Sequence, residues 1–179
     1  MKRFICGAIL VTAFTGCNSR PGEPEFRAER EGLRFVPPQG WSERARGDAA
    51  SCGQKHDRLL VQYKRLQAGA PAWLRVTVAD MPPSRPLDVC LAERAPGNWK
   101  RESEVEKIQV GGLPAVRASF VGRWHDRDLR CELVAVRRGS EVYWFSGTWP
   151  VNDVAARDQV RDAVGSAVWD TTKLALAEH

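Results

Sequence analysis

Residues 105–149 read VEKIQVGGLPAVRASFVGRWHDRDLRCELVAVRRGSEVYWFSGTW, and they carry the clearest strand pattern of the chain. Apolar and polar residues alternate along much of it, which is typical of strands with one face against a core. The predicted strands are 105–110, 113–121, 129–137 and 141–149, with turns at 111–112 and 138–140 and a polar connection at 124–128. Connections this short join antiparallel strands, because parallel strands need a long crossover. The stretch is therefore predicted to form an antiparallel meander.

More strands are predicted upstream of the meander. Residues 33–36, 59–66 and 73–79 are rich in apolar, aromatic and branched side chains and are bounded by turn residues. Residues 42–58 are charged and rich in glycine and alanine, so we expect a loop there. The chain therefore contributes three strands before the meander begins.

Two helices are predicted, one on each side of the meander in the sequence. Ser84 is a suitable N-cap for the first, whose apolar face consists of Leu87, Cys90 and Leu91. Asn152 is the expected cap of the second. Its apolar stripe consists of Ala156, Val160, Ala163, Val164, Ala167 and Val168. Helices that cover an antiparallel sheet predict a single α+β domain over residues 32–170, followed by a tail at 171–179.

Three short segments resemble PsbP-like domains, whose superfamily includes the Ran-binding Mog fold and several bacterial lipoproteins. They are Phe35 to Trp41 (FVPPQGW), the Gly111 to Ala115 turn (GGLPA), and the Gly139 hairpin before Tyr143; a closing helix follows them. The resemblance implies an α/β/α sandwich with an antiparallel central sheet. It implies no catalytic residues, and known members act mostly as accessory or binding proteins.

The N-terminus indicates export. Met1 to Arg3 is basic, an apolar stretch follows to Phe14, and the segment Phe14-Thr15-Gly16-Cys17 resembles the lipobox of bacterial lipoproteins. The resemblance implies a signal peptide over 1–16 and a lipid on Cys17. Residues 17–31 are then expected to be a flexible tether. Two alternatives stay open: secretion after cleavage at Ala13, and an uncleaved anchor.

The expected location is the cell envelope. Asn18 follows Cys17 where an Asp would resemble an inner-membrane retention signal, so the outer membrane is slightly favoured over a secreted or periplasmic product. Removing residues 1–16 takes away Lys2 and Arg3 and lowers the formal net charge from +5 to +3. No block of like charge runs along the chain, which argues against nucleic acid as a partner.

The cysteines allow at most one internal disulfide. With Cys17 lipidated, Cys52, Cys90 and Cys131 remain, an odd number. Cys90 and Cys131 are both predicted on buried faces, so they are the preferred pair, with Cys52 as the alternative partner. Three unpaired thiols remain an open alternative.

Few residues indicate chemistry. The spacing of Cys52 and His56 suits a metal, but no second pair of ligands exists, so neither a metal site nor a cofactor is expected. His125 and Asp126 would need Ser119 or Ser146 nearby to act in hydrolysis, and no nucleophile elbow is present. We therefore expect no catalytic residues and no enzyme activity.

Seven tryptophans are many for this length, and most are expected in the core. Trp124, beside His125 and Arg127, is the candidate for an exposed contact with a ligand or partner. The sequence thus predicts a lipid-anchored envelope accessory or binding protein with an unidentified envelope protein or small ligand as partner. The alternatives are a hydrolase that uses His125 and Asp126 and a sugar- or peptidoglycan-binding module that uses exposed Trp side chains.

Overall fold

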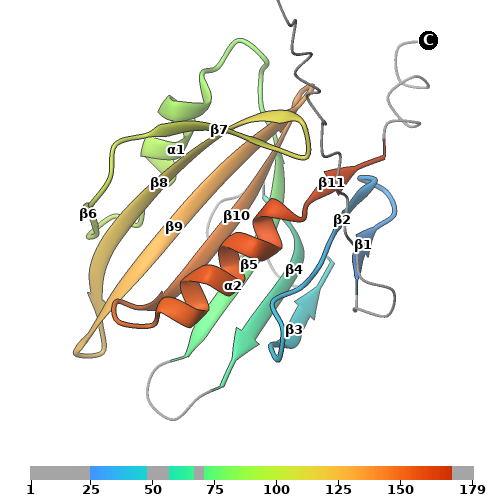
Figure 1. The fold of residues 1–179 in the computed structure, drawn as a ribbon. Coiled ribbons are helices and arrows are strands. Elements are labelled where there is room, and N and C mark those ends of the chain that lie inside the picture. Colours follow the sequence, from blue (N-terminus) through green and yellow to red (C-terminus); the bar gives the residue numbers. More distant parts are fainter. Residues whose placement is uncertain (1–24, 48–56, 67–70, 171–179) are drawn as a thin grey trace, which may run out of the picture.

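The computed structural model describes residues 25–47, 57–66 and 71–170 (Figure 1). Its strands are β1 (Phe26–Ala28), β2 (Leu33–Phe35), β3 (Ser42–Arg46), β4 (Arg58–Arg65), β5 (Ala72–Asp80), β6 (Lys100–Arg101), β7 (Glu106–Val110), β8 (Leu113–Trp124), β9 (Arg127–Arg138), β10 (Glu141–Pro150) and β11 (Val168–Trp169). Its helices are α1 (Leu87–Arg94) and α2 (Val154–Gly165). The predicted signal peptide, Cys17, Cys52, His56 and the tail at 171–179 lie outside the described residues.

An eight-stranded antiparallel sheet organises the chain. Its order is β3-β4-β5-β10-β9-β8-β6, and β7 also pairs with β8. The strands β7, β8, β9 and β10 pair in sequence order, so the predicted antiparallel meander is confirmed. The three upstream strands join it where β5 pairs with β10, with Trp73 opposite Thr148. That pairing connects segments that the meander and α1 separate in the sequence.

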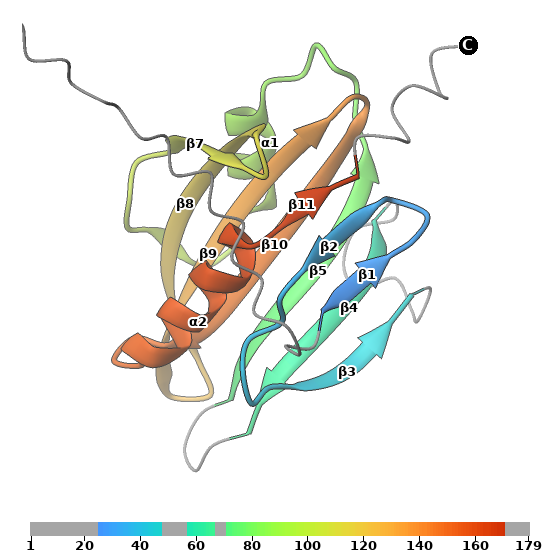
Figure 2. The same ribbon diagram turned by 45° about the vertical axis from the view of Figure 1, so that its right-hand side comes forward.

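The two faces of the large sheet are covered differently (Figures 1 and 2). On one face, α1 packs with Cys90 and Leu91 against an apolar cluster that includes Trp144. On the other face, α2 is accompanied by a small sheet of order β1-β2-β11. The fold is therefore rich in antiparallel sheet with two helices, and it departs from the expected α/β/α sandwich because strands share one outer layer with α2.

Consecutive aromatic residues of β10 serve opposite faces. Tyr143 and Phe145 are buried in the cluster under α2 and the small sheet, and Trp144 is buried in the cluster under α1. Side chains alternate across a strand, so a central strand covered on both faces needs large apolar groups at successive positions. β10 is such a strand, because β5 and β9 flank it and both faces are covered.

One strand lies where a loop was expected. β3 pairs with β4 from Ser42 opposite Lys64 to Arg46 opposite Val61. The prediction of a loop over residues 42–58 is wrong for this part. β3 is the outermost strand and its side chains are mostly exposed, so it lacks the apolar alternation by which strands are recognised in a sequence.

The fold begins earlier than residue 32. β1 pairs with β2 with Phe26 opposite Phe35, and Phe26 is buried. Glu31 is also buried, and its carboxylate lies 2.5 Å from the Arg58 guanidinium. Residues 26–31, expected to be part of a tether over 17–31, are thus held by sheet pairing and by an ion pair.

The helix ends differ from those predicted. α1 starts after Pro86, and no side chain caps it, so Ser84 does not serve as its N-cap. Asp153 rather than Asn152 caps α2, because its Oδ1 accepts a hydrogen bond from the Ala156 N–H at 3.0 Å. The predicted apolar stripe ends at Val164, because the chain leaves the helix after Gly165 and pairs as β11 with β2.

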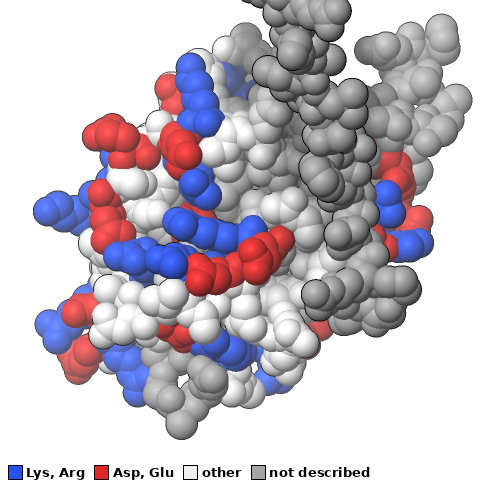
Figure 3. All heavy atoms as spheres, viewed as in Figure 1, with Lys and Arg blue, Asp and Glu red and all other residues white. Residues whose placement is uncertain are grey.

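Charges of both signs are interleaved on the face that carries α2 (Figure 3). Arg161 of α2 pairs with Glu132 of β9, and Arg117 of β8 pairs with Glu106 of β7 at 2.7 Å. The pairs lie side by side, so this face presents no extended patch of one sign.

Candidate functional site

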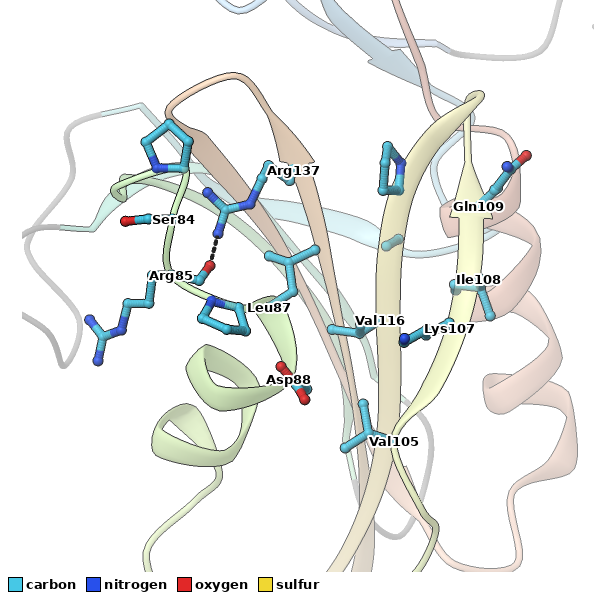
Figure 4. Close-up of a pocket in the computed structure, with 14 residues that line it drawn as sticks. Ser84, Arg85, Leu87, Asp88, Val105, Lys107, Ile108, Gln109, Val116 and Arg137 are labelled. Atoms are coloured by element: carbon cyan, nitrogen blue, oxygen red, sulfur yellow. Dashed lines mark hydrogen bonds between the residues drawn. The ribbon is translucent and has the colours of Figure 1, made fainter.

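A groove of about 630 Å³ opens between the start of α1 and the β7–β8 hairpin (Figure 4). The segment 83–88 forms one wall and β7 forms the other. Val116 of β8 lies on the floor, and Leu87 and Val105 extend the apolar lining. Ligand pockets of proteins commonly measure about 300–1,000 Å³ and combine an apolar lining with a few polar groups. The groove has both properties.

Prolines and one arginine shape the first wall. Pro82, Pro83 and Pro86 donate no main-chain hydrogen bonds, so the chain leaves β5 without continuing the sheet. The Arg137 guanidinium of β9 donates to the Pro82 carbonyl at 3.1 Å and to the Arg85 carbonyl at 2.6 Å. Arg137 therefore ties the wall to the sheet, and the groove is formed before any ligand binds.

The second wall is formed by side chains of β7, which point alternately to the two faces of the sheet. Ile108 and Val110 pack into the cluster on the α2 side of the sheet. Because successive side chains of a strand point to opposite faces, Lys107 and Gln109 face the groove side, and Val105 precedes them there. Figure 4 shows Lys107 reaching over the floor beside Val116. Together with Val105, the strand thus offers the groove an apolar, a cationic and an amide side chain.

The charges of the groove are divided between its walls. Lys107 is exposed and has no ion pair among the residues that the structure describes. Asp88 lies on the opposite wall, where its Oδ1 accepts a hydrogen bond from the Val89 N–H at 3.0 Å. Arg85 pairs with Glu93, which raises the pKa of the Arg85 guanidinium. The groove lining therefore carries more cations than carboxylates, and Lys107 forms no ion pair with a described residue.

The predicted contact residues Trp124, His125 and Arg127 lie together elsewhere, at the tip of the β8–β9 hairpin. Trp124 is 44% exposed, and its ring meets that of Trp73 edge-on at 5.5 Å and that of His125 at 4.4 Å. Arg127 and Arg137 are ten residues apart on β9, so the tip lies about 33 Å from the groove along the strand. The tip and the groove are separate features.

The tip turn is shorter than predicted. β8 runs to Trp124 and β9 starts at Arg127, so only His125 and Asp126 connect them. Both have positive φ, 45° and 60°, as a two-residue hairpin turn of type I′ requires. The turn holds the exposed indole of Trp124 at a defined position between Trp73 and the His125 ring.

His125 is not brought together with either candidate serine. Ser119 is buried on the α2 side of the sheet, where its Oγ donates to Glu132 at 3.5 Å. Ser146 lies on β10 opposite Leu133, with its Oγ 3.9 Å from the Cys131 sulfur. His125 instead contacts the Trp124 ring. The arrangement of histidine, acid and serine that hydrolysis would need is not formed by these residues.

Cys90 and Cys131 are both free thiols, so the candidate disulfide between them is not present. Each is buried in the cluster under α1. Burial raises the pKa of the Cys131 thiol. Both side chains therefore act as apolar packing groups, one on α1 and one on β9. Cys52, the alternative partner, lies outside the described residues.

Within residues 25–47, 57–66 and 71–170, no three His, Cys, Asp or Glu side chains converge as metal ligands. In the same ranges, no helix has the length and apolar content needed to cross a membrane.

The groove is not among the features that the sequence predicts. Its residues come from segments that are far apart in the chain, and only their pairing brings Val105, Val116 and Arg137 together. Two signals point in its direction: the prolines at 82, 83 and 86 indicate a rigid segment off the sheet, and Lys107 lies on the same side of its strand as Val105, opposite the side of Ile108 and Val110. Neither signal shows that the two segments face each other.

Comparison with known proteins identifies the fold. No family model matches the sequence, and no curated protein sequence matches it. The structure is similar to LpqN of Mycobacterium tuberculosis, a protein involved in cell envelope biogenesis, with a TM-score of 0.58, 10% identity, and coverage of 84% of this chain and 86% of LpqN. It is also similar to the cyanobacterial PsbP protein CyanoP of Synechocystis, with a TM-score of 0.58, 13% identity, and coverage of 88% of this chain and 99% of CyanoP.

A third similar structure comes from Bacteroides thetaiotaomicron, with a TM-score of 0.56 and 10% identity. The match covers 83% of this chain and 49% of that protein. The likeness to CyanoP supports the PsbP-like architecture that the sequence segments implied. At these identities the similarity establishes the fold and leaves function to the residues of this chain.

Proposed function

We propose that the protein is a lipid-anchored accessory protein of the cell envelope that binds its partner in the groove between α1 and β7. The groove carries the proposal: it is preformed, partly apolar, and lined by a lysine that has no ion-pair partner in the described residues. The role of LpqN in cell envelope biogenesis supports the envelope setting.

The anchor is proposed from the sequence. Cleavage before Cys17 and lipidation of its sulfur and amine would hold the chain at a membrane, because several acyl chains bind far more firmly than one. Metabolic labelling with a clickable fatty acid should label the wild-type chain and leave the Cys17→Ser chain unlabelled. A mature chain that begins at Phe14 would show secretion instead of anchoring. Asn18 makes the outer membrane the proposed location.

The role is proposed to be non-catalytic. His125 lies on an exposed tip, Ser119 is bonded to Glu132, and the groove holds a lysine and an aspartate on opposite walls. Nucleic acid is not proposed as a partner, because charges of both signs alternate on the surface seen in Figure 3.

Site-specific photocrosslinking in living cells tests the groove. A photoreactive amino acid at Asp88 lies on its wall, and the same amino acid at Asp158 of α2 lies on the opposite face of the sheet. Both positions are exposed. We expect a discrete adduct at position 88, reduced by Lys107→Glu, and none at position 158. Equal labelling at both positions, or none at 88, would reject the groove as the binding site.

A second candidate function rests on the hairpin tip. Trp124 is held between Trp73 and His125 while 44% of it stays exposed, an arrangement that suits stacking on a sugar ring. Binding of soluble peptidoglycan fragments, followed by tryptophan fluorescence, should then be lost in Trp124→Ala and kept in Lys107→Glu. The reverse pattern assigns binding to the groove.

A further inference from the structure

α1 covers only part of its face of the large sheet. It packs mainly on β8 and β9, and Figures 1 and 2 show it toward the β7–β8 side of the sheet, away from β4. On β4 and β5, residues that alternate with those buried under α2 direct their side chains to the α1 side. Four of these side chains are partly exposed: Gln62, Lys64, Trp73 and Arg75. This end of the face therefore presents polar and aromatic groups rather than an apolar core.

The strand pairing arranges these side chains in two rows. Lys64 is opposite Trp73 in the β4–β5 pair, and Gln62 is opposite Arg75. In the β5–β10 pair, Arg75 is also opposite Ser146, which is partly exposed. Cross-strand neighbours share a face, and rows two residues apart lie about 7 Å from each other. The rows thus place cationic, amide and hydroxyl side chains beside an indole.

Trp124 extends the row of Trp73 from the β8–β9 hairpin. Its ring meets that of Trp73 edge-on at 5.5 Å, and 44% of Trp124 is exposed. Arg127 is opposite Trp124, so its side chain leaves the sheet on the same face. The face of an aromatic ring carries partial negative charge. The C–H groups of a sugar ring carry partial positive charge, so the exposed indole surface suits a saccharide.

The charges at this end of the face are positive. Lys64, Arg75 and Arg127 form no ion pair with a described residue. Arg75 Nη2 donates a hydrogen bond to Gln62 Oε1 at 3.2 Å, which holds the guanidinium beside the row of Trp73. In the described strands β4, β5, β9 and β10, no side chain directed to this face is a carboxylate. An anionic group therefore complements the three cations.

We infer that this face binds a saccharide that carries an anionic group, either a carboxylate or a phosphate. The sugar ring stacks on the exposed indole surface of Trp73 and Trp124. Arg75 and Lys64 bind the anion, and Gln62 donates a hydrogen bond from its amide nitrogen to a sugar hydroxyl. An acyl chain would leave these polar groups unpaired, which makes it the poorer ligand. The inference rests on the second candidate function, since it names the ligand class of the Trp124 site and extends that site onto β4 and β5.

Three disaccharides test the inference with the mature protein purified in detergent. N-acetylglucosamine linked to N-acetylmuramic acid carries a carboxylate, glucosamine disaccharide bisphosphate carries phosphates, and chitobiose is neutral. Isothermal titration calorimetry measures the affinity for each. We expect at least one anionic disaccharide to bind about tenfold more tightly than chitobiose, because hydrogen bonds to charged groups are the stronger ones. The tighter of the two anionic probes identifies the anion as carboxylate or phosphate.

Variants separate the cations from the indoles. Arg75→Gln and Lys64→Gln remove a charge from partly exposed positions, so each should weaken the anionic disaccharide by about threefold to tenfold and leave chitobiose unchanged. Trp124→Ala should weaken all three disaccharides, because it removes the stacking surface. Lys107→Gln makes the same change of charge in the groove, where it should leave the three affinities close to wild type.

The outcomes separate this inference from the functions proposed above. Anionic disaccharides that bind no more tightly than chitobiose, or that bind equally well to Arg75→Gln and Lys64→Gln, overturn the inference. If chitobiose binding is still lost in Trp124→Ala, sugar binding at the hairpin tip stands and its selectivity for anions is rejected. If no disaccharide binds, both are rejected. Crosslinking at Asp88 reports on the groove alone, so the leading proposal is decided independently.

Discussion

Val160 of α2 lies directly over Gly147 of β10. A Cβ built on Gly147 would lie 2.5 Å from Val160 Cγ1 and 2.8 Å from a ring carbon of Trp149. The helix approaches the central strand this closely because the glycine has no side chain. Gly165, at the end of the same helix, has no such neighbour within 4 Å.

The two glycines should therefore respond in opposite ways to alanine. Gly147→Ala is expected to lower the free energy of unfolding by about 1–3 kcal/mol, since the added methyl group displaces α2. Gly165→Ala is expected to raise it by up to about 1 kcal/mol through helix propensity. Denaturant unfolding of the two variants measures both. Similar effects of one sign would contradict the close packing of α2.

The ion pair between Arg161 and Glu132 should contribute more to the free energy of unfolding than the exposed pair between Arg117 and Glu106. Glu132 is 2% exposed, and Arg161 Nε donates to its Oε2 at 3.1 Å. Arg161→Ala leaves a buried carboxylate without its cation, so we expect a loss of about 2–3 kcal/mol in unfolding free energy. Arg117→Ala, which breaks a pair with the exposed Glu106, should cost less than about 1 kcal/mol. Equal losses would show that burial of Glu132 has no consequence.

The chain has two tyrosines, and in the folded protein both should ionise at a higher pH than in the unfolded chain. Burial raises the pKa of Tyr63 to about 12, and burial together with its hydrogen bond to Glu141 raises the pKa of Tyr143. Unfolded tyrosine titrates near pH 10. The stability that both tyrosines contribute is therefore complete below about pH 10. It is lost as the pH rises through the pKa values that they have in the folded protein.

Ultraviolet absorbance of tyrosinate measures this directly. The folded protein should form almost no tyrosinate at a pH where the chain unfolded in denaturant is largely ionised. Tyr63→Phe should reduce the fall in stability between about pH 10 and 12. Titration of either tyrosine at the unfolded pKa would contradict its burial.

The thiols of Cys90 and Cys131 should be unreactive in the native protein. Both are buried and free, and burial raises the pKa of Cys131, so little thiolate is available for alkylation. Mass spectrometry after alkylation should find both residues modified in denaturant without a reductant, and neither under native conditions. A requirement for reductant would reveal a disulfide that the structure does not contain.

The hairpin tip offers a test of backbone strain. Asp126 has a positive φ of 60°, which costs an L-residue about 1 kcal/mol. Asp126→Gly should therefore stabilise the protein by roughly that amount and leave the Trp124–His125 contact in place. Asp128→Gly, two residues later in β9, should destabilise it, because glycine weakens a strand. A loss of stability in Asp126→Gly would indicate that the Asp side chain holds the turn.

The meander follows from local features of the sequence. Alternation of side chains and short turns are local properties, so β7 to β10 and their antiparallel pairing could be predicted from residues 105–149. Tyr143, Trp144 and Phe145 are successive large aromatic residues, which is the pattern of a strand covered on both faces. Elements without a local signal were missed: β3 is exposed, and β11 is two residues long.

The way in which distant segments meet depends on tertiary packing. The pairing of β5 with β10 depends on the combined packing of both faces of the sheet, and no turn between these strands specifies it. That pairing places the proline segment after β5 opposite β7, where Arg137 bonds it to the sheet and the groove forms. Cys90 and Cys131 lie in one cluster without forming a disulfide for the same reason. A helix and a strand pack together to bury apolar surface, and this burial does not align any particular pair of atoms for a bond.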